Sequence, residues 1–520
     1  MFLFRFAALL AGVICTTLVA PRAAIAQDVE LRSLDGSVTL EGDLVAFDGA
    51  YYRLTTAYGP LTIAAEGVSC AGPGCPDLAS FIAEARVAGA STVAETLLPS
   101  LLSGFAESRG MIVSGPTQTG PDLIYTLTRQ GGGTAARFIV TPGTSDTGIL
   151  ALLNGDTDLA LSLRPASEAE RRADRAIAPD DPALIRRVRV IGLDALVPIV
   201  AQRNTVRALS LPQLAQILTG EIDNWRDFGG PDAPIALHLL DAGLGLAQSF
   251  EGRMVPSGDV GAPHVTRHSH ATDLAMAVAR DAYALGVTAQ SARGTARALT
   301  LAGTCGFSQA ADATSIKAED YPLTAPVYVY LAPHRLPQLV RDFLSWTETE
   351  AAETIVERAG FINQSLTRTP LNQQGTRLAN ALAAAGNDVT LQDLQRLVAT
   401  LGDAERLSTT FRFDDGSVDL DAQSRAAITR LAAAIERGAF DGRRLMFIGF
   451  SDSAGPPAIN LRLSLRRAEA VRDAVLAAAE AAGPDRITFV TDAFGEGMPM
   501  ACEDTDWGRA VNRRVEVWVQ

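Results

Sequence analysis

The stretch GFSDSAGPPAINLRLSLRRAEAV, Gly449 to Val471, joins an apolar run to a helical pattern and sets one carboxylate between them. The residues RRLMFIGF predict a buried strand that ends just before Asp452. A helix starting near Ile459 would place Arg467 about two turns from its beginning. A carboxylate and a guanidinium a few ångströms apart can pair with each other as a surface ion pair, or they can hold the two ends of a zwitterion.

Residues 406–520 repeat this alternation of strands and helices. The segments STTFRF, RRLMFIGF, DRITFV and VEVWV read as strands, and two amphipathic patterns between them read as helices. This order predicts an α/β sandwich. The apolar face expected for the second helix consists of Leu461, Leu465, Ala468, Val471 and Val475.

Three motifs in this module resemble the peptidoglycan-binding domain of the OmpA family. They are G-F-S-D-S-x-G, N-x-x-L-S-x-x-R-A and the run from Gly508 to Val515. The resemblance implies that Asp452 takes the ammonium group of diaminopimelate and Arg467 its carboxylate. The family usually has His-Thr before the aspartate, and Phe450-Ser451 here removes one polar side chain but keeps the pair. The other motif positions, which shape the site or the fold, are Asn460, Leu463, Arg509 and Arg513.

The N-terminus has the form of a secretory signal. Arg5 precedes an apolar run that ends in the small-residue cleavage site Ala24-Ile25-Ala26, so residues 1–26 are predicted to be a signal peptide. An uncleaved membrane anchor is the alternative, although the run is short for a spanning helix. Because Ile14 rather than a small residue precedes Cys15, we do not expect lipidation.

Composition and charge limit the classes of partner that the protein can bind. The chain has 520 residues with a formal net charge of −14, and cleavage of the signal would make it more negative. This charge argues against nucleic acid and anionic membranes as partners. In an oxidising compartment, Cys70 and Cys75 can close a small loop around a Pro-Gly turn. Cys305 and Cys502 either pair or stay free.

The remaining chain divides by pattern. Residues 27–80 predict a small β module, because short β-forming runs alternate with Asp-Gly and Gly-Pro turns. Residues 81–365 mix short apolar strands with helices, which is typical of an α/β domain. Residues 366–405 are predicted to be a helical linker.

Two hydroxyl-rich helix starts lie in the α/β region. Ser91 and Thr92 open one helix, and Thr144, Ser145 and Thr147 open another, with Ser162 and Arg164 following a strand. Each start alone is an ordinary N-cap. Together with the arginine, they are candidates for an oxyanion site.

The segment LSLPQLAQILTGEIDNWRDFGGPDAPI, Leu209 to Ile235, resembles the phosphate-binding proteins of ABC transporters. The resemblance implies two lobes with a ligand cleft between them, and transfers Ser91, Thr92, Ser145 and Ser162 as ligand-binding positions. Where that family has an arginine and a Ser-Gly-Thr turn in its second lobe, this chain has Leu240, Leu244 and Leu246. The expected ligand is therefore a small anion, but the phosphate shell is incomplete.

His264, His268 and His270 lie within seven residues, a spacing that could bind a metal ion. No cysteine or glutamate joins them nearby, so we expect ordinary surface histidines and no metal or other cofactor. Ser91 lacks the nucleophile-elbow motif G-x-S-x-G, and we do not expect an enzyme.

The sequence predicts a periplasmic, solute-binding-like protein of a Gram-negative bacterium, held noncovalently to peptidoglycan and located at the cell wall or outer membrane. The alternative is an envelope scaffold whose cleft has decayed and which links peptidoglycan to another protein. A protein partner for the N-terminal β module is a further expectation.

Overall fold

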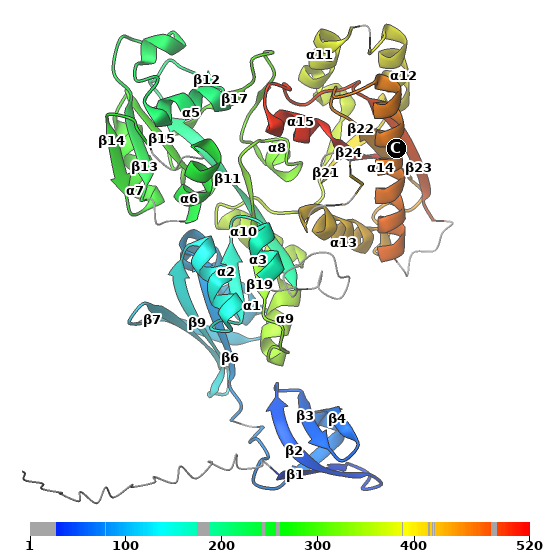
Figure 1. Ribbon diagram of the computed structural model, residues 1–520. Helices are drawn as coiled ribbons and strands as arrows, with labels where there is room; N and C mark the ends of the chain where they lie inside the picture. The colour runs from blue at the N-terminus through cyan, green and yellow to red at the C-terminus, as the bar shows by residue number, and fades with distance from the viewer. Residues whose placement is uncertain are drawn as a thin grey trace, which may run out of the picture. The chain divides into compact units, whose positions relative to one another are not determined.

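The computed structural model describes residues 28–78, 80–173, 187–241, 245–255, 260–386, 388–413, 417–418, 420, 422–479 and 486–520. The predicted signal peptide 1–26, Cys15 and Leu244 lie outside the described residues. The chain forms two compact units, one ending at Phe81 and one spanning Ile82–Gln520 (Figure 1). Among the described residues, no helix is both long and apolar enough to cross a membrane.

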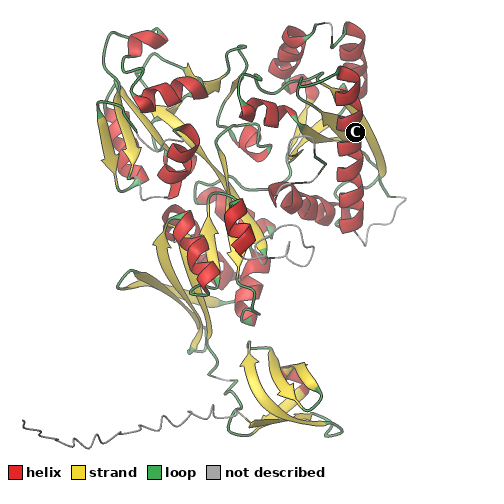
Figure 2. Cartoon of the chain, in the orientation of Figure 1, coloured by secondary structure: helices red, strands yellow, loops and turns green. Residues whose placement is uncertain are grey.

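The N-terminal unit is built mainly of strands, drawn in yellow in Figure 2. Its antiparallel sheet has the order β4-β3-β2-β1-β5 and buries Val29, Leu31, Tyr52 and Leu54. The predicted Cys70–Cys75 disulfide is confirmed, with the two Cα atoms 5.8 Å apart. The strands are β1 Asp28–Ser33, β2 Thr39–Phe47, β3 Tyr51–Thr56, β4 Gly59–Ala64 and β5 Val68–Ala71.

The middle of the chain forms one mixed sheet of eleven strands: ten follow the path β14-β13-β15-β11-β19-β10-β6-β9-β8-β7, and β16 pairs with β11. The first lobe contains β6 Ala83–Ala90, α1 Leu98–Ser108, β7 Met111–Thr119, β8 Asp122–Arg129, β9 Thr134–Gly143, α2 Ser145–Asn154, β10 Leu159–Ser162, α3 Glu168–Ala173, β19 Thr324–Leu331, α9 Gln338–Trp346 and α10 Glu350–Arg358. The second lobe contains α5 Leu211–Thr219, β13 Ala236–Leu240, α6 Gly245–Met254, β14 Val265–His268, α7 Ala271–Arg280, β15 Ala284–Ala289 and β16 Arg297–Ala298. A small sheet adds β12 Ala208–Leu209, β17 Thr300–Ala302 and β18 Ser308–Gln309.

The long strand β11, Val188–Val200, joins the two lobes. Its first part, up to Ala195, pairs with β19, and its second part, from Leu196, pairs with β15. The chain returns to the first lobe through residues 310–323, which include α8 (Ala313–Lys317). These two crossings are therefore the positions at which the lobes could change their relative angle.

Asp194 is buried at this crossing. Its Oδ2 accepts a hydrogen bond from Ser291 Oγ at 2.6 Å, and its Oδ1 accepts one from Ala195 N at 2.7 Å. Burial raises the pKa of Asp194 to about 6, although these hydrogen bonds act against it. The folded chain thus holds this proton more tightly than the unfolded chain. The resulting stability is complete below the unfolded pKa near 4 and is lost as the pH rises through about 6.

We expect Asp194→Asn to remove this pH dependence, since the amide keeps an acceptor for Ser291 and carries no charge. The free energy of unfolding of the wild type should fall relative to the variant by on the order of 2–3 kcal/mol from about pH 4 to about pH 7. Urea denaturation at the two pH values measures this difference. An unchanged difference between the two proteins would contradict the assignment.

The C-terminal sheet has the order β20-β21-β24-β22-β23, with helices packed on both faces. The long helix α14 (orange in Figure 1) and α13 cover one face, and α11 and α12 cover the other. The predicted α/β sandwich is confirmed. The elements are β20 Arg368–Pro370, α11 Gly375–Ala384, α12 Leu391–Leu401, β21 Glu405–Arg412, α13 Ala422–Glu436, β22 Arg444–Phe450, α14 Pro457–Ala478, β23 Thr488–Gly495, α15 Asp506–Asn512 and β24 Arg514–Val519.

Residues 366–405, which the sequence predicts to be a helical linker, pack onto this sheet. Their strand β20 pairs with β21, and Leu394, Leu397 and Leu401 of α12 contact the core around Trp518. The predicted domain limits 27–80, 81–365, 366–405 and 406–520 stay predictions.

Candidate functional site

Asp452 follows the end of β22, as the sequence predicts. Its side chain is buried, and its Oδ2 accepts a hydrogen bond from Arg513 Nη1 at 2.7 Å. The guanidinium that pairs directly with this carboxylate therefore comes from Arg513, at the end of α15. Because Arg513 itself is only 13% exposed, the ion pair is largely shielded from water.

Arg467 lies on α14 with no exposed surface. Its Nε donates to the carbonyl oxygen of Ser417 at 2.9 Å, and its guanidinium carbon lies 5.0 Å from the centroid of the Phe413 ring. These contacts hold the side chain at the chain segment after β21. A ligand could reach Arg467 only if the groups that cover it moved.

The inward face of α14 explains how Arg467 becomes buried. The helix buries Asn460, Ser464 and Arg467 toward its N-terminus and apolar residues further along. The predicted apolar face is wrong for Leu461 and Leu465, which are 43% and 36% exposed. The polar stripe can approach the sheet because Gly449 has no side chain: a Cβ there would lie 2.0 Å from the carbonyl oxygen of Ser464.

Two glutamates that the sequence analysis did not identify lie beside Asp452. Asn460 Nδ2 donates to the carbonyl oxygen of Asp452 at 3.2 Å and to Glu496 Oε1 at 2.8 Å. Glu503 accepts from the backbone N of Ser453 at 3.0 Å. Both glutamates lie in or near the loop between β23 and α15, where no motif distinguishes them from ordinary surface acids.

These carboxylates make one side of the site acidic. Burial raises the pKa of Glu496, and the nearby Asp388, Glu503 and Asp452 raise it further, while the hydrogen bond from Asn460 lowers it. A site in which carboxylates lie close together favours a cation, because the cation offsets the repulsion between them. The arrangement is therefore suited to an ammonium group.

Arg509 contributes indirectly. Its Nη1 donates to the carbonyl oxygen of Glu503 at 2.8 Å, and its Nη2 donates to Asp506 on the same helix. Asn512 Nδ2 donates to Glu503 Oε1 at 2.9 Å. The start and end of α15 thus position the Glu503 carboxylate. The structure brings together Asp452, Asn460, Arg509 and Arg513 through these contacts, and places Arg467 against Phe413 and Ser417.

In the middle domain, two predicted ligand-binding hydroxyls are engaged internally. Ser145 is 1% exposed, and its Oγ accepts from the backbone N of Leu163 at 3.0 Å. Ser162 is fully buried, and its Oγ donates to the carbonyl oxygen of Arg164 at 2.7 Å. Ser91 and Thr92 are half-buried at the beginning of the helical segment after β6. These last two offer the more accessible hydroxyls.

The nearby arginine is neutralised. Arg164 Nε donates to Asp146 Oδ1 at 2.8 Å, and its Nη2 donates to Glu170 Oε1 at 2.7 Å. Arg164 lowers the pKa of Glu170 to about 2, against the effect of burial, and the hydrogen bonds from Ser167 lower it further. Because two carboxylates share one guanidinium, Arg164 provides no net positive charge for an anion.

In the second lobe, Leu240 ends β13 and is buried. Leu244 lies outside the described residues, and the side chain of Leu246 is not described. Of the three neighbouring histidines, His264 and His270 are exposed, whereas Nε2 of His268 lies 2.8 Å from Nδ1 of His238. Among the described residues, no cluster of three or more histidine, cysteine, aspartate or glutamate side chains could hold a metal ion.

Two family models match the chain. The PBP superfamily domain model matches residues 80–350, and the OmpA family model matches residues 412–513. Neither is a family of enzymes.

Relatives of the C-terminal region include outer membrane porin F of Pseudomonas fluorescens, 46% identical over 72 residues, which are 14% of this chain and 21% of the porin. The probable lipoprotein YiaD of Escherichia coli is 31% identical over 105 residues, 20% of this chain and 45% of YiaD. The chain spans between about a fifth and a half of the length of the curated relatives it matches. Among solved structures, an ABC-type phosphate transport receptor from Vibrio cholerae is 20% identical, with a TM-score of 0.40, over 54% of this chain and 99% of the receptor.

Proposed function

Because the chain belongs to the PBP superfamily through residues 80–350 and carries an OmpA-family domain, we propose that it is a binding-type protein of the Gram-negative periplasm held noncovalently to peptidoglycan. The observation that carries the proposal is the buried Asp452 at a strand end, with Asn460, Glu496 and Glu503 around it. In this proposal Asp452 takes the ammonium of diaminopimelate. Before ligand arrives, the Asp452 carboxylate is paired with Arg513.

The role proposed for Arg467 is to bind the carboxylate of the same ligand with its guanidinium fork. It would do so after the groups around Ser417 and Phe413 move. Arg513 is the alternative residue for binding this carboxylate, since its Nη1 already lies 2.7 Å from Asp452 Oδ2. Sedimentation of the purified full chain with diaminopimelate-containing sacculi tests the proposal, and lysine-type sacculi serve as the ligand control.

A second candidate function is an envelope scaffold whose cleft has no small ligand. The buried Leu240 and the internal hydrogen bonds of Ser145 and Ser162 favour it. The half-buried Ser91 and Thr92 favour a remaining anion site.

We expect the full chain to bind phosphate weakly or not at all. A buried oxyanion needs donors on every side, and here the nearby guanidinium is shared by Asp146 and Glu170. Loss of one charged contact at roughly 1.5–3 kcal/mol and two neutral ones at about 1 kcal/mol each corresponds to about two to four decades of affinity. Calorimetric titration with phosphate, sulfate and small carboxylates measures this. Micromolar phosphate binding would show that the second lobe supplies donors from its backbone.

A further inference from the structure

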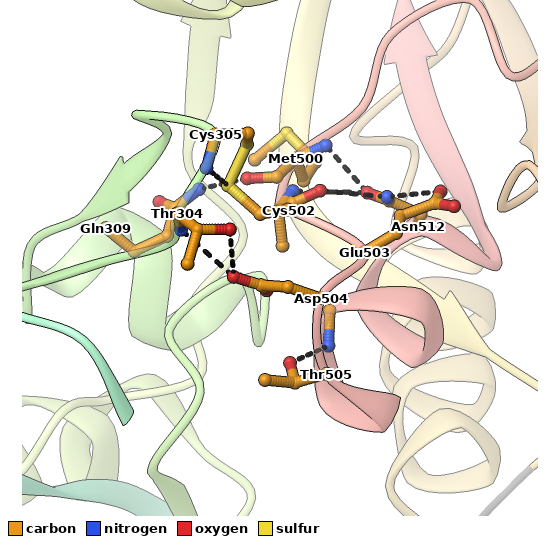
Figure 3. The surroundings of a disulfide bond; sticks show 11 residues. Thr304, Cys305, Gln309, Met500, Cys502, Glu503, Asp504, Thr505 and Asn512 are labelled. Atoms are coloured by element: carbon orange, nitrogen blue, oxygen red, sulfur yellow. Dashed lines mark hydrogen bonds between the residues drawn. A yellow bond between two sulfur atoms is a disulfide. The ribbon is translucent and has the colours of Figure 1, made fainter. Parts of the chain in front are cut away.

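The hairpin β17–β18, which leads into the return crossing of residues 310–323, is bonded covalently to the C-terminal domain. Figure 3 shows the disulfide between Cys305 and Cys502, which are 197 residues apart in the sequence. Beside it, Thr304 donates to Asp504 Oδ2 from its backbone N at 3.0 Å and from its Oγ1 at 2.6 Å. One end of the crossing therefore cannot leave the C-terminal domain without breaking a covalent bond.

The other end of the crossing is held by buried charges. Asp320 is 2% exposed; its Oδ2 accepts from Arg406 Nη1 at 2.8 Å, and its Oδ1 accepts from Arg412 Nη2 at 2.9 Å. Arg412 Nη2 also donates to the carbonyl oxygen of Ala318 at 3.0 Å. Both arginines belong to β21 of the C-terminal sheet. Separating these groups would leave buried charges without partners.

The C-terminal domain also contacts the first crossing. Helix α13 packs near β11, and Ala427 and Arg430 of α13 line the same small cavity as Leu193 of β11. Both crossings thus contact the same domain. A hinge motion requires backbone rotation at the crossings, and packed contacts on both of them oppose it.

We propose that the C-terminal domain acts as a brace that fixes the angle between the two lobes, and that the Cys305–Cys502 disulfide is its removable part. Cys305 is exposed whereas Cys502 is buried, so a reductant can reach the bond from one side. A small dithiol supplies two electrons and two protons to the disulfide, which gives two cysteine thiols and leaves the reagent as a cyclic disulfide. After reduction, the hydrogen bonds from Thr304 to Asp504, from Gln309 to the carbonyl oxygen of Met500 and from Arg406 and Arg412 to Asp320 remain.

The brace is tested by measuring the distance between the lobes in the full chain. Spin labels are placed through noncanonical amino acids at Leu150 of α2 and Met276 of α7, which are 58% and 50% exposed. Pulsed electron paramagnetic resonance then compares the wild type with Cys305→Ser/Cys502→Ser. The matched control is Cys70→Ser/Cys75→Ser, which removes the other disulfide, in the N-terminal unit.

We expect a narrow distance distribution for the wild type and for the control. The Cys305→Ser/Cys502→Ser chain should give a distribution roughly twice as wide, or one with a second maximum. If this variant does not fold, the folded wild type is reduced with dithiothreitol and judged by the same criterion. A distribution that stays as narrow after loss of the disulfide, or a wild-type distribution already as wide, would overturn the proposal.

Discussion

Replacing Asp452 by Asn should release the protein from diaminopimelate-containing sacculi. The amide keeps the shape of the side chain but removes the charge that is proposed to hold the ammonium group. The loss of one charge-assisted hydrogen bond, about 1.5–3 kcal/mol, corresponds to roughly 10- to 150-fold weaker binding. Arg467→Ala should weaken binding by a similar factor, because the ligand carboxylate would lose its fork. Cosedimentation of the full chain over a range of sacculus concentrations measures both effects.

The control for Arg467 is its neighbour. Arg466→Ala removes the same charge from an exposed position on α14, and it should bind sacculi as the wild type does. Circular dichroism establishes that each variant is folded, which matters because Arg467 is fully buried. Wild-type binding by both Asp452→Asn and Arg467→Ala would reject the proposed site. Loss with Arg513→Ala but not with Arg467→Ala would assign the carboxylate to Arg513 instead.

The position of Asp452 was predictable because it depends on local signals. The apolar run of β22 and the Gly-Pro-Pro that follows it define where the strand ends and where α14 begins. The partner of Asp452 was not predictable from spacing. Arg513 lies 61 residues further along the chain, and the arrangement of β24 and α15 alone brings it to the end of β22.

Buried polar residues account for the other differences between the sequence-based predictions and the structure. The strand β21 has the sequence ERLSTTFR, which reads as a strand with one face in water, yet seven of its eight residues are buried. Its arginines pair with acids from distant parts of the chain, and no sequence period reports such pairs. The sequence likewise does not decide whether Cys305 and Cys502 pair, since 197 residues separate the two cysteines.

The second large effect concerns the buried charges of the C-terminal sheet. Glu516 is fully buried, and its Oε1 accepts from Arg514 Nε at 2.7 Å and from Arg377 Nη2. Its Oε2 lies 3.3 Å from Arg406 Nε. Burial by itself raises the pKa of Glu516, but the three arginines outweigh burial and hold this pKa far below the usual range. One carboxylate thus contacts three guanidinium groups inside the sheet, and Asp320 is a second acid of this cluster.

Glu516→Gln should therefore destabilise the chain strongly. The amide fits the same space but leaves the buried Arg377 and Arg514 without the carboxylate that contacts them, a change that typically costs about 3–5 kcal/mol. Because the pKa of Glu516 is lowered on folding, its contribution is present above the unfolded pKa near 4 and is lost as the pH falls below that value. The wild type should thus lose stability toward acid more steeply than the variant. Guanidinium denaturation at about pH 7 and about pH 2.5 measures both effects.

The matched control is Asp506→Asn, whose side chain is 99% exposed in its ion pair with Arg509 and should change stability by no more than about 1 kcal/mol. Equal effects of the two substitutions at neutral pH would show that the buried cluster does not stabilise the sheet, since an acid in water and an acid among three buried arginines would then be interchangeable.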